Sequence, residues 1–269
     1  MKQLWAWIRF FRLINLMMIA FLFWVLEYVV LQPLLASQGI GLSISYANFD
    51  WLVLDVLIVA ATGYIINDWY DIEIDRINRP TRLLVAYPLS RKYFYALYFT
   101  LLALGLFITL YLAVSEQKLW HALLYPVFVF ALWYYAAKTK SHGLKGNLKV
   151  AMAIVCLPWL VVLAESSSVA LLNAMSAELF QQLMLHLICF SMLLGIANAL
   201  REIVKDAEDA QGDQAGNVQS FYLKRGPKST RILSFALVLT LLVLKNLFLM
   251  FLSFFFLFPL SLGSQFSIL

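Results

Sequence analysis

Two groups of three aspartates are the residues of this chain best suited to chemistry. The same D-x-x-D-x-x-x-D spacing joins the members of each group, which are Asp68, Asp71 and Asp75 in the first acid motif and Asp206, Asp209 and Asp213 in the second. On a helix that turns about 100° per residue, positions i, i+3 and i+7 fall within roughly 60° of arc. We therefore expect each motif to project its carboxylates from one helical face.

Six carboxylates that share one space repel each other unless they take up protons or bind a cation. Oxygen-only ligands suit a hard divalent ion such as Mg²⁺, which keeps few protein ligands and binds phosphates readily. The two motifs therefore predict a magnesium site, with all six aspartates as candidate ligands.

The composition places this site in a membrane protein. Hydrophobic residues make up 63% of the chain, charged residues only 13%, and the mean hydropathy is +0.82. Soluble domains average about 45–50% apolar residues. Apolar stretches recur near the ~20 residues that span a bilayer as a helix, at 13–31, 51–66, 93–114, 119–137, 150–164, 179–200 and 232–244.

These stretches predict an all-α, multi-pass transmembrane helix bundle with seven crossings. A further apolar stretch at 246–262 could begin an eighth. No change in composition divides the chain, so we expect a single transmembrane domain over residues 1–269.

The basic residues predict how the bundle is oriented. If the N-terminus is cytoplasmic, 18 of the 20 lysines and arginines fall at that side, and the opposite loops hold only Lys118. The positive-inside rule then places the N-terminus and both acid motifs on the cytoplasmic side of a cytoplasmic membrane. Topology accounts for most of the net charge of +5, and nothing indicates nucleic acid as a partner.

Neighbouring polar residues share the register of the acid motifs. Asn67 and Lys205 each precede a motif by one position, and Asn198 lies upstream on the face of Asp206. Glu73 and Glu208 project from the opposite faces, where we expect them to be solvated.

At this point the residues resemble a known family. The segment NDWYDIEIDRINRP, from Asn67 to Pro80, resembles the first aspartate-rich motif of the membrane-embedded UbiA-type prenyltransferases, and REIVKDAEDAQGD, from Arg201 to Asp213, resembles the second. The likeness extends over about residues 9 to 245 and includes Arg12, Asn15, Tyr135, Lys140, Gly146 and Asn147. The form of the second motif is most similar to geranylgeranylglycerol-phosphate geranylgeranyltransferases, and homogentisate-type aromatic prenyltransferases carry a similar form.

The resemblance implies Mg²⁺-dependent transfer of an isoprenyl group from a prenyl diphosphate, with geranylgeranyl diphosphate expected as donor. The implied acceptor is geranylgeranylglycerol phosphate, or an aromatic compound of the homogentisate or 4-hydroxybenzoate type, and membrane lipids surround the protein. Together with the register of the motifs, it implies a set of substrate-binding residues: Asn15, Asn67, Arg79, Arg82, Lys138, Lys140, Asn198 and Lys205.

Members of this family usually have nine membrane helices, whereas this sequence shows seven or eight. We therefore expect a chain that is short at its C-terminus, with closure of the helix ring and hence activity in question. Two other functions stay open: a catalytically silent binding protein of the same fold, and a cation transporter. A transporter is expected to have acidic residues near the bilayer midplane, whereas both motifs here are expected at one surface.

Overall fold

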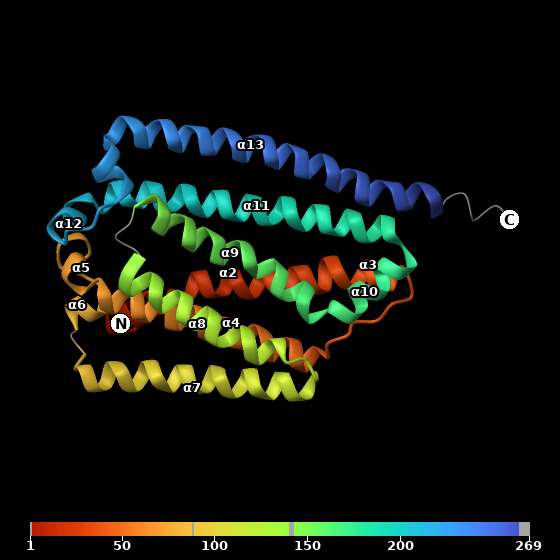
Figure 1. Ribbon diagram of the computed structural model, residues 1–269, viewed down its shortest axis with the longest axis horizontal. Helices are drawn as coiled ribbons and strands as arrows, with labels where there is room; N and C mark the ends of the chain where they lie inside the picture. Colours follow the sequence, from red (N-terminus) through yellow and green to blue (C-terminus); the bar gives the residue numbers. More distant parts are fainter. Residues whose placement is uncertain (1, 88, 140–142, 264–269) are drawn as a thin grey trace.

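The computed structural model describes residues 2–87, 89–139 and 143–263. Within these ranges every regular element is a helix, and the long helices lie roughly side by side as a bundle (Figure 1). In lipid, every backbone N–H and C=O group must be bonded within its own segment, so long apolar segments fold as helices. The predicted all-α fold is confirmed.

Seven helical stretches in the described chain are long and apolar enough to cross a membrane. Five are formed by single helices: α4 (Tyr46–Tyr70), α7 (Arg91–Ser115), α9 (Leu144–Ala164), α11 (Ala177–Glu208) and α13 (Phe221–Gly263). The other two each include a π-helical turn: α2 (Leu13–Trp24) continues through η1 (Val25–Leu31) into α3 (Gln32–Ala36), and α8 (Trp120–Tyr134) continues into η2 (Tyr135–Thr139).

The suggested eighth crossing does not form a separate helix in the described chain. Residues 246–262 continue α13, which runs to Gly263. No glycine or proline lies between Ile232 and Phe258, so no residue ahead of Pro259 interrupts this part of the helix. The kink in α13 lies at the other end, at Gly226, whose φ of 76° favours glycine.

Serine caps start three of the long helices. The side chains of Ser45, Ser90 and Ser176 accept hydrogen bonds from backbone N–H groups in the first turns of α4, α7 and α11. Each cap satisfies an N–H group that has no partner inside the helix. The three serines therefore fix the first residues of α4, α7 and α11.

Packing between the helices follows the chain only in part. Helix α11 packs between α9 and α13, whereas α4 contacts α2, α7 and α8. Buried apolar side chains, including Phe23, Phe49 and Leu172, form the larger core cluster. A second cluster, with Phe10 and Phe94, packs α1 (Lys2–Phe10) and α6 (Leu83–Ala86) against α4 and α7.

Three short helices lie at the end of the bundle that holds the acid motifs. Here α5 (Ile72–Asn78), α6 and α12 (Ala210–Ala215) lie near the N-terminus, and α10 (Ser166–Met175) lies at the opposite end (Figure 1). Helix α5 follows α4, α12 follows α11, and α5 packs against α12. The two acid motifs are thereby brought to the same end of the molecule.

Candidate active site

A helix break lies within each acid motif, at its middle aspartate. Asp71 separates α4 from α5 with φ −91° and ψ 0°, and Asp209 separates α11 from α12 with φ −87° and ψ 2°. Helical hydrogen bonding continues past both breaks, because the N–H of Asp75 donates to the carbonyl of Asp71 at 2.7 Å and that of Asp213 to Asp209 at 3.0 Å. Each acid motif therefore spans a bend between two helices and does not lie on one straight helix as expected.

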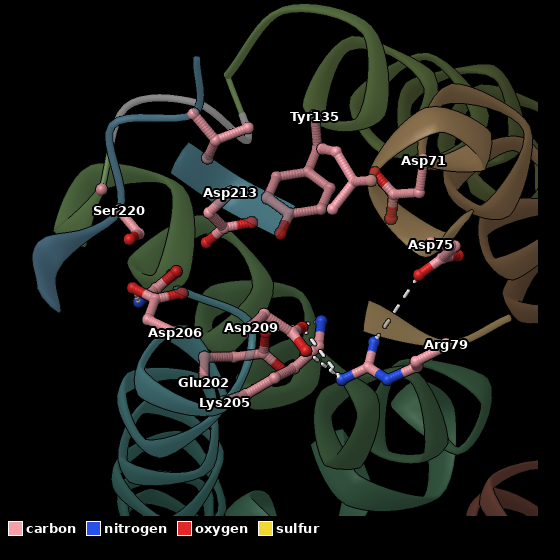
Figure 2. Close-up of a pocket in the computed structure, with 14 residues that line it drawn as sticks. Asp71, Asp75, Arg79, Tyr135, Glu202, Lys205, Asp206, Asp209, Asp213 and Ser220 are labelled. Atoms are coloured by element: carbon pink, nitrogen blue, oxygen red, sulfur yellow. Dashed lines mark hydrogen bonds and ion pairs between the residues drawn. The ribbon is translucent and has the colours of Figure 1, made fainter. Parts of the chain in front are cut away.

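Five of the six aspartates line one cavity, called here the acid pocket (Figure 2). They are Asp71, Asp75, Asp206, Asp209 and Asp213. Other polar residues of the lining are Arg79, Tyr135, Asn147, Glu202, Lys205 and Ser220. Glu202 and Ser220 are additions to the site predicted from the sequence, and Tyr135 and Asn147 were named there only as part of the family likeness. Side chains more than 130 positions apart in the chain thus share one space.

Asp68 lies outside the lining of the acid pocket. Its side chain is buried, and its Oδ1 accepts from Nη2 of Arg12 at 2.8 Å and from Nη1 of Arg82 at 3.0 Å. The structure therefore separates the first aspartate of the motif from the other five.

Arginine side chains cross between the carboxylates of the acid pocket. Arg79 donates through Nη2 to both oxygens of Asp209, at 2.7 and 2.9 Å, and its Nη1 lies 3.9 Å from Oδ1 of Asp75 (Figure 2). Arg82 donates to Oδ2 of Asp75 at 2.5 Å. Arginine charge therefore links the first motif to the second.

Buried charge shifts the pKa values on this side of the pocket. Burial raises the pKa of Asp75, and the charge of Asp71 adds to the rise, while Arg82 opposes it. Burial alone would lower the pKa of Arg82, but the carboxylates of Asp68 and Asp75 outweigh it and the pKa is raised. Burial therefore favours the protonated form of Asp75, and the nearby carboxylates favour the charged form of Arg82.

Amide side chains hold individual carboxylates in place. Nδ2 of Asn67 donates to Oδ2 of Asp71 at 2.8 Å. Nδ2 of Asn147 donates to Oδ2 of Asp206 at 3.0 Å, and the backbone N–H of Phe221, at the start of α13, donates to the same oxygen at 3.2 Å. These bonds fix the direction in which the two carboxylates point.

Asn78 connects the two acid motifs and was not among the site residues predicted from the sequence. Its Nδ2 donates to the carbonyl of Asp209 at 2.9 Å, and its Oδ1 accepts from the N–H of Gly212 at 2.9 Å. A Cβ at Gly212 would lie 2.4 Å from Nδ2 of Asn78, so only glycine fits here. One signal was available, because Asn78 follows Asp75 by three positions and so extends the helical spacing of the first motif.

The remaining predicted site residues have different positions. Lys205 lines the acid pocket, with Nζ 3.8 Å from Oε2 of Glu202. Lys138 is exposed in η2, Asn15 is half-buried, and neither lines the pocket. Asn198 also lies outside the lining, and its buried Nδ2 has no hydrogen-bond partner in the described part of the chain. Lys140 lies outside the described residues.

The carboxylate oxygens of the acid pocket suit a Mg²⁺ ion that is held by few protein ligands. Within the described residues, no three acidic, histidine or cysteine side chains are grouped closely enough to hold one ion. Magnesium commonly binds through one or two carboxylates together with waters and substrate phosphates. The free volume of the pocket is about 20 Å³, which is enough for one water-sized group.

A second cavity adjoins the acid pocket and is called here the cationic pocket. Its volume is about 390 Å³. Its lining consists of Arg12, Arg79, Arg82, Arg201, Val204, Lys205 and Glu208. Arg79 and Lys205 line both cavities. A site rich in carboxylates and a site rich in guanidinium groups therefore lie next to each other.

The fold and site define a multi-helix membrane protein with a polar, acid-lined centre at one end of its bundle. The UbiA prenyltransferase family profile matches residues 29–268. The chain therefore belongs to the UbiA prenyltransferase family.

Curated relatives are 30–32% identical to this chain over the aligned residues. Digeranylgeranylglyceryl phosphate synthase of Saccharolobus solfataricus is 30% identical over 202 residues, which is 74% of this chain and 65% of the relative. The same-named protein of Korarchaeum cryptofilum is 31% identical over 198 residues, covering 72% and 63%. That of Methanoregula boonei is 32% identical over 187 residues, covering 69% and 60%. The matches thus span a little under two thirds of these relatives.

A solved structure of digeranylgeranylglyceryl phosphate synthase has a similar fold. Its TM-score is 0.59 at 22% sequence identity, and the match covers 92% of this chain and 77% of the other. At this identity the likeness concerns the fold.

Proposed function

We propose that this chain transfers a geranylgeranyl group from geranylgeranyl diphosphate to geranylgeranylglycerol phosphate in a Mg²⁺-dependent reaction. The observation that carries the proposal is the meeting of both acid motifs in one pocket, together with Arg79 and Lys205. The names of the relatives support a glycerol-phosphate lipid as acceptor.

The residues that line the acid pocket would hold Mg²⁺ at the place where the diphosphate of the donor binds. One or two of the carboxylates of Asp71, Asp75, Asp206, Asp209 and Asp213 would bind each Mg²⁺, together with waters and substrate phosphates. The ion when bound supplies charge that makes the diphosphate a better leaving group. Arg79 and Lys205 would add positive charge beside the phosphate oxygens. Electrostatic stabilisation of this kind is commonly the largest contribution to catalysis.

The bonds that change are the allylic C–O bond of the donor and an O–H bond of the acceptor. The electron pair of the C–O bond leaves with the diphosphate, and the acceptor hydroxyl attacks the allylic carbon and releases its proton. Tyr135 projects into the pocket between the two motifs (Figure 2). Its ring would stabilise positive charge on the allyl group, because aromatic faces attract cations.

Product analysis tests this function directly. Purified protein is incubated with geranylgeranyl diphosphate and geranylgeranylglycerol phosphate, with Mg²⁺ or with a chelator, and products are identified by mass. We expect the diether lipid with Mg²⁺, loss of activity by orders of magnitude in chelator, and recovery when Mg²⁺ is restored. Full turnover in chelator would contradict the metal dependence.

Parallel reactions with homogentisate and 4-hydroxybenzoate test the acceptor. Prenylated aromatic product without any diether lipid would assign the chain to the aromatic branch. Absence of product with every acceptor would favour a silent binding protein.

A further inference from the structure

We propose that the cationic pocket binds the phosphate monoester of the acceptor lipid, and that Asp68 is a positioning residue for this phosphate rather than a metal ligand. This inference rests on the proposed function and adds a separate site for the second substrate. Four features of the pocket support it: its charge, the conformation of Arg12, the contacts of Asp68 and its border with the acid pocket.

The charge and size of the cationic pocket match a phosphate headgroup. Its lining carries four arginines and a lysine, and Glu208 is the one carboxylate among the lining residues. The carboxylates that pair with these cations lie outside the lining of this pocket: Asp68, Asp75, Asp209 and Glu202. The volume of about 390 Å³ lies within the range of roughly 300–1,000 Å³ usual for small-molecule sites. Guanidinium groups are well suited to phosphate because they can donate two parallel N–H bonds to its oxygens.

Arg12 is held in an unusual conformation that directs it to this pocket. Its φ of 50° and ψ of 49° lie in the left-handed region, which a residue other than glycine adopts only at a cost. Its guanidinium carbon lies 4.6 Å from the ring centroid of Tyr64, and its Nη2 is bonded to Asp68. Two contacts thus offset the strain and fix the guanidinium at the edge of the cavity that it lines.

Asp68 holds two arginines of the pocket side by side. A single oxygen, Oδ1, accepts from both Arg12 and Arg82. Two guanidinium groups repel each other, and a buried carboxylate between them reduces that repulsion. Each guanidinium has five N–H donors, and only Nη2 of Arg12 and Nη1 of Arg82 are bonded to Asp68.

The shared border of the two cavities would place the substrates together. Arg79 and Lys205 line both pockets, so an acceptor phosphate in the cationic pocket lies beside the donor diphosphate in the acid pocket. Arg12 and Arg82, the two arginines held by Asp68, line the cationic pocket and not the acid pocket. A change at Arg12 should therefore affect binding of the acceptor and leave binding of the donor nearly unchanged.

Steady-state kinetics of single variants test the assignment. We expect Arg12→Gln, Arg201→Gln and Asp68→Asn to raise the KM for geranylgeranylglycerol phosphate about tenfold or more, as for loss of a hydrogen bond to a charged group. The KM for geranylgeranyl diphosphate and the Mg²⁺ concentration for half-maximal rate should change less than about twofold. Arg201 is included because its side chain is 57% exposed, so its replacement tests the pocket even if a variant at buried Asp68 fails to fold.

Arg76→Gln is the matched control. Its side chain is 62% exposed, pairs with Glu73 on the surface and lines neither pocket. This variant also removes one arginine charge, and we expect both KM values to stay at the wild-type level. A rise of the acceptor KM in Arg76→Gln equal to that in Arg12→Gln would show a general effect of charge and overturn the proposal.

A binding measurement separates failure of the pocket from failure of the function. Geranylgeranylglycerol phosphate is titrated onto the detergent-solubilised full chain in chelator without donor, beside its dephosphorylated alcohol. We expect tight binding that needs the phosphate and is weakened by Arg12→Gln. If this holds while no diether forms, the pocket stands and the proposed function fails. If diether forms with an unchanged acceptor KM in all three variants, or if the donor KM rises instead, the pocket assignment is wrong.

Discussion

At the scale of the residue, Asp68 and Asp71 of the first motif have different surroundings. Asp68 is enclosed by Arg12 and Arg82, whereas Asp71 accepts from Asn67 and faces the acid pocket. The charge of Asp68 is matched by guanidinium groups, and its side chain does not line the acid pocket. A carboxylate that lines a pocket with other carboxylates gains free energy by binding a cation.

The first prediction concerns single acids of the pocket. Asp71→Asn and Asp209→Asn keep the shape of the side chain and remove its charge, so we expect kcat to fall by a factor of about 100 or more. Glu73→Gln is the matched control, because the Glu73 side chain is 75% exposed and pairs with Arg76 on the surface. Its kcat should stay near the wild-type value in the same prenyl-transfer assay. Similar losses in all three variants would show that the acid pocket has no special role.

Glu208 is not an equivalent control, although the spacing places it opposite the second motif. It is exposed, as predicted, but it lines the cationic pocket. Removing its charge would change the balance of a site that the proposed acceptor occupies.

At the scale of the element, two bent helices make the site. The breaks at Asp71 and Asp209 let α5 and α12 leave the directions of α4 and α11 and pack against each other. Asn78 then ties the start of α12 to α5 through two hydrogen bonds. The relative position of the two acid motifs therefore depends on contacts between these short helices.

The second prediction tests the contact between α5 and α12. In Gly212→Ala the new Cβ would lie 2.4 Å from Nδ2 of Asn78, and this side chain cannot move without losing its two bonds. Overpacking of this kind usually costs about 1–3 kcal/mol, so we expect a lower Tm in detergent and reduced prenyl transfer. Gly41→Ala is the control, because a Cβ there has no atom within 4 Å. Equal Tm values for the two variants would argue against a tight contact at Gly212.

At the scale of the whole molecule, the distribution of charge predicts the orientation in the membrane. Ser167, near the start of α10, and Lys224, in the first turn of α13, are both exposed. Helix α10 and the start of α13 lie near opposite ends of the bundle (Figure 1). The positive-inside rule assigns the end with Lys224 to the cytoplasm.

The third prediction tests this orientation by cysteine labelling. In intact cells, Ser167→Cys should react with a membrane-impermeant maleimide, and Lys224→Cys should react only after permeabilisation. The native Cys156 and Cys189 are half-buried within spanning helices, and the unmodified chain gives the background. Labelling of Lys224→Cys alone in intact cells would reverse the assigned topology.

Local properties of the chain were enough to predict its class. The length of the apolar stretches predicted seven spanning helices, because a segment in lipid must satisfy its own backbone hydrogen bonds. The repeated spacing of Asp71, Asp75, Asp209 and Asp213 indicated a shared acidic site, because helical periodicity is set by positions close together in the chain. The family resemblance followed from the same two motifs.

Only the tertiary structure decided which of these side chains meet. The sequence assigned Asp68 to the metal site with the other five aspartates, and packing of α2 against α4 puts Arg12 beside it. Lys138 had the charge expected of a phosphate ligand, yet η2 leaves it exposed and away from both pockets. Asn78 lies 131 positions from Asp209, and its role arises where α5 contacts α12. Spacing determines the face on which a residue lies, whereas its partner depends on which distant helix packs against that face.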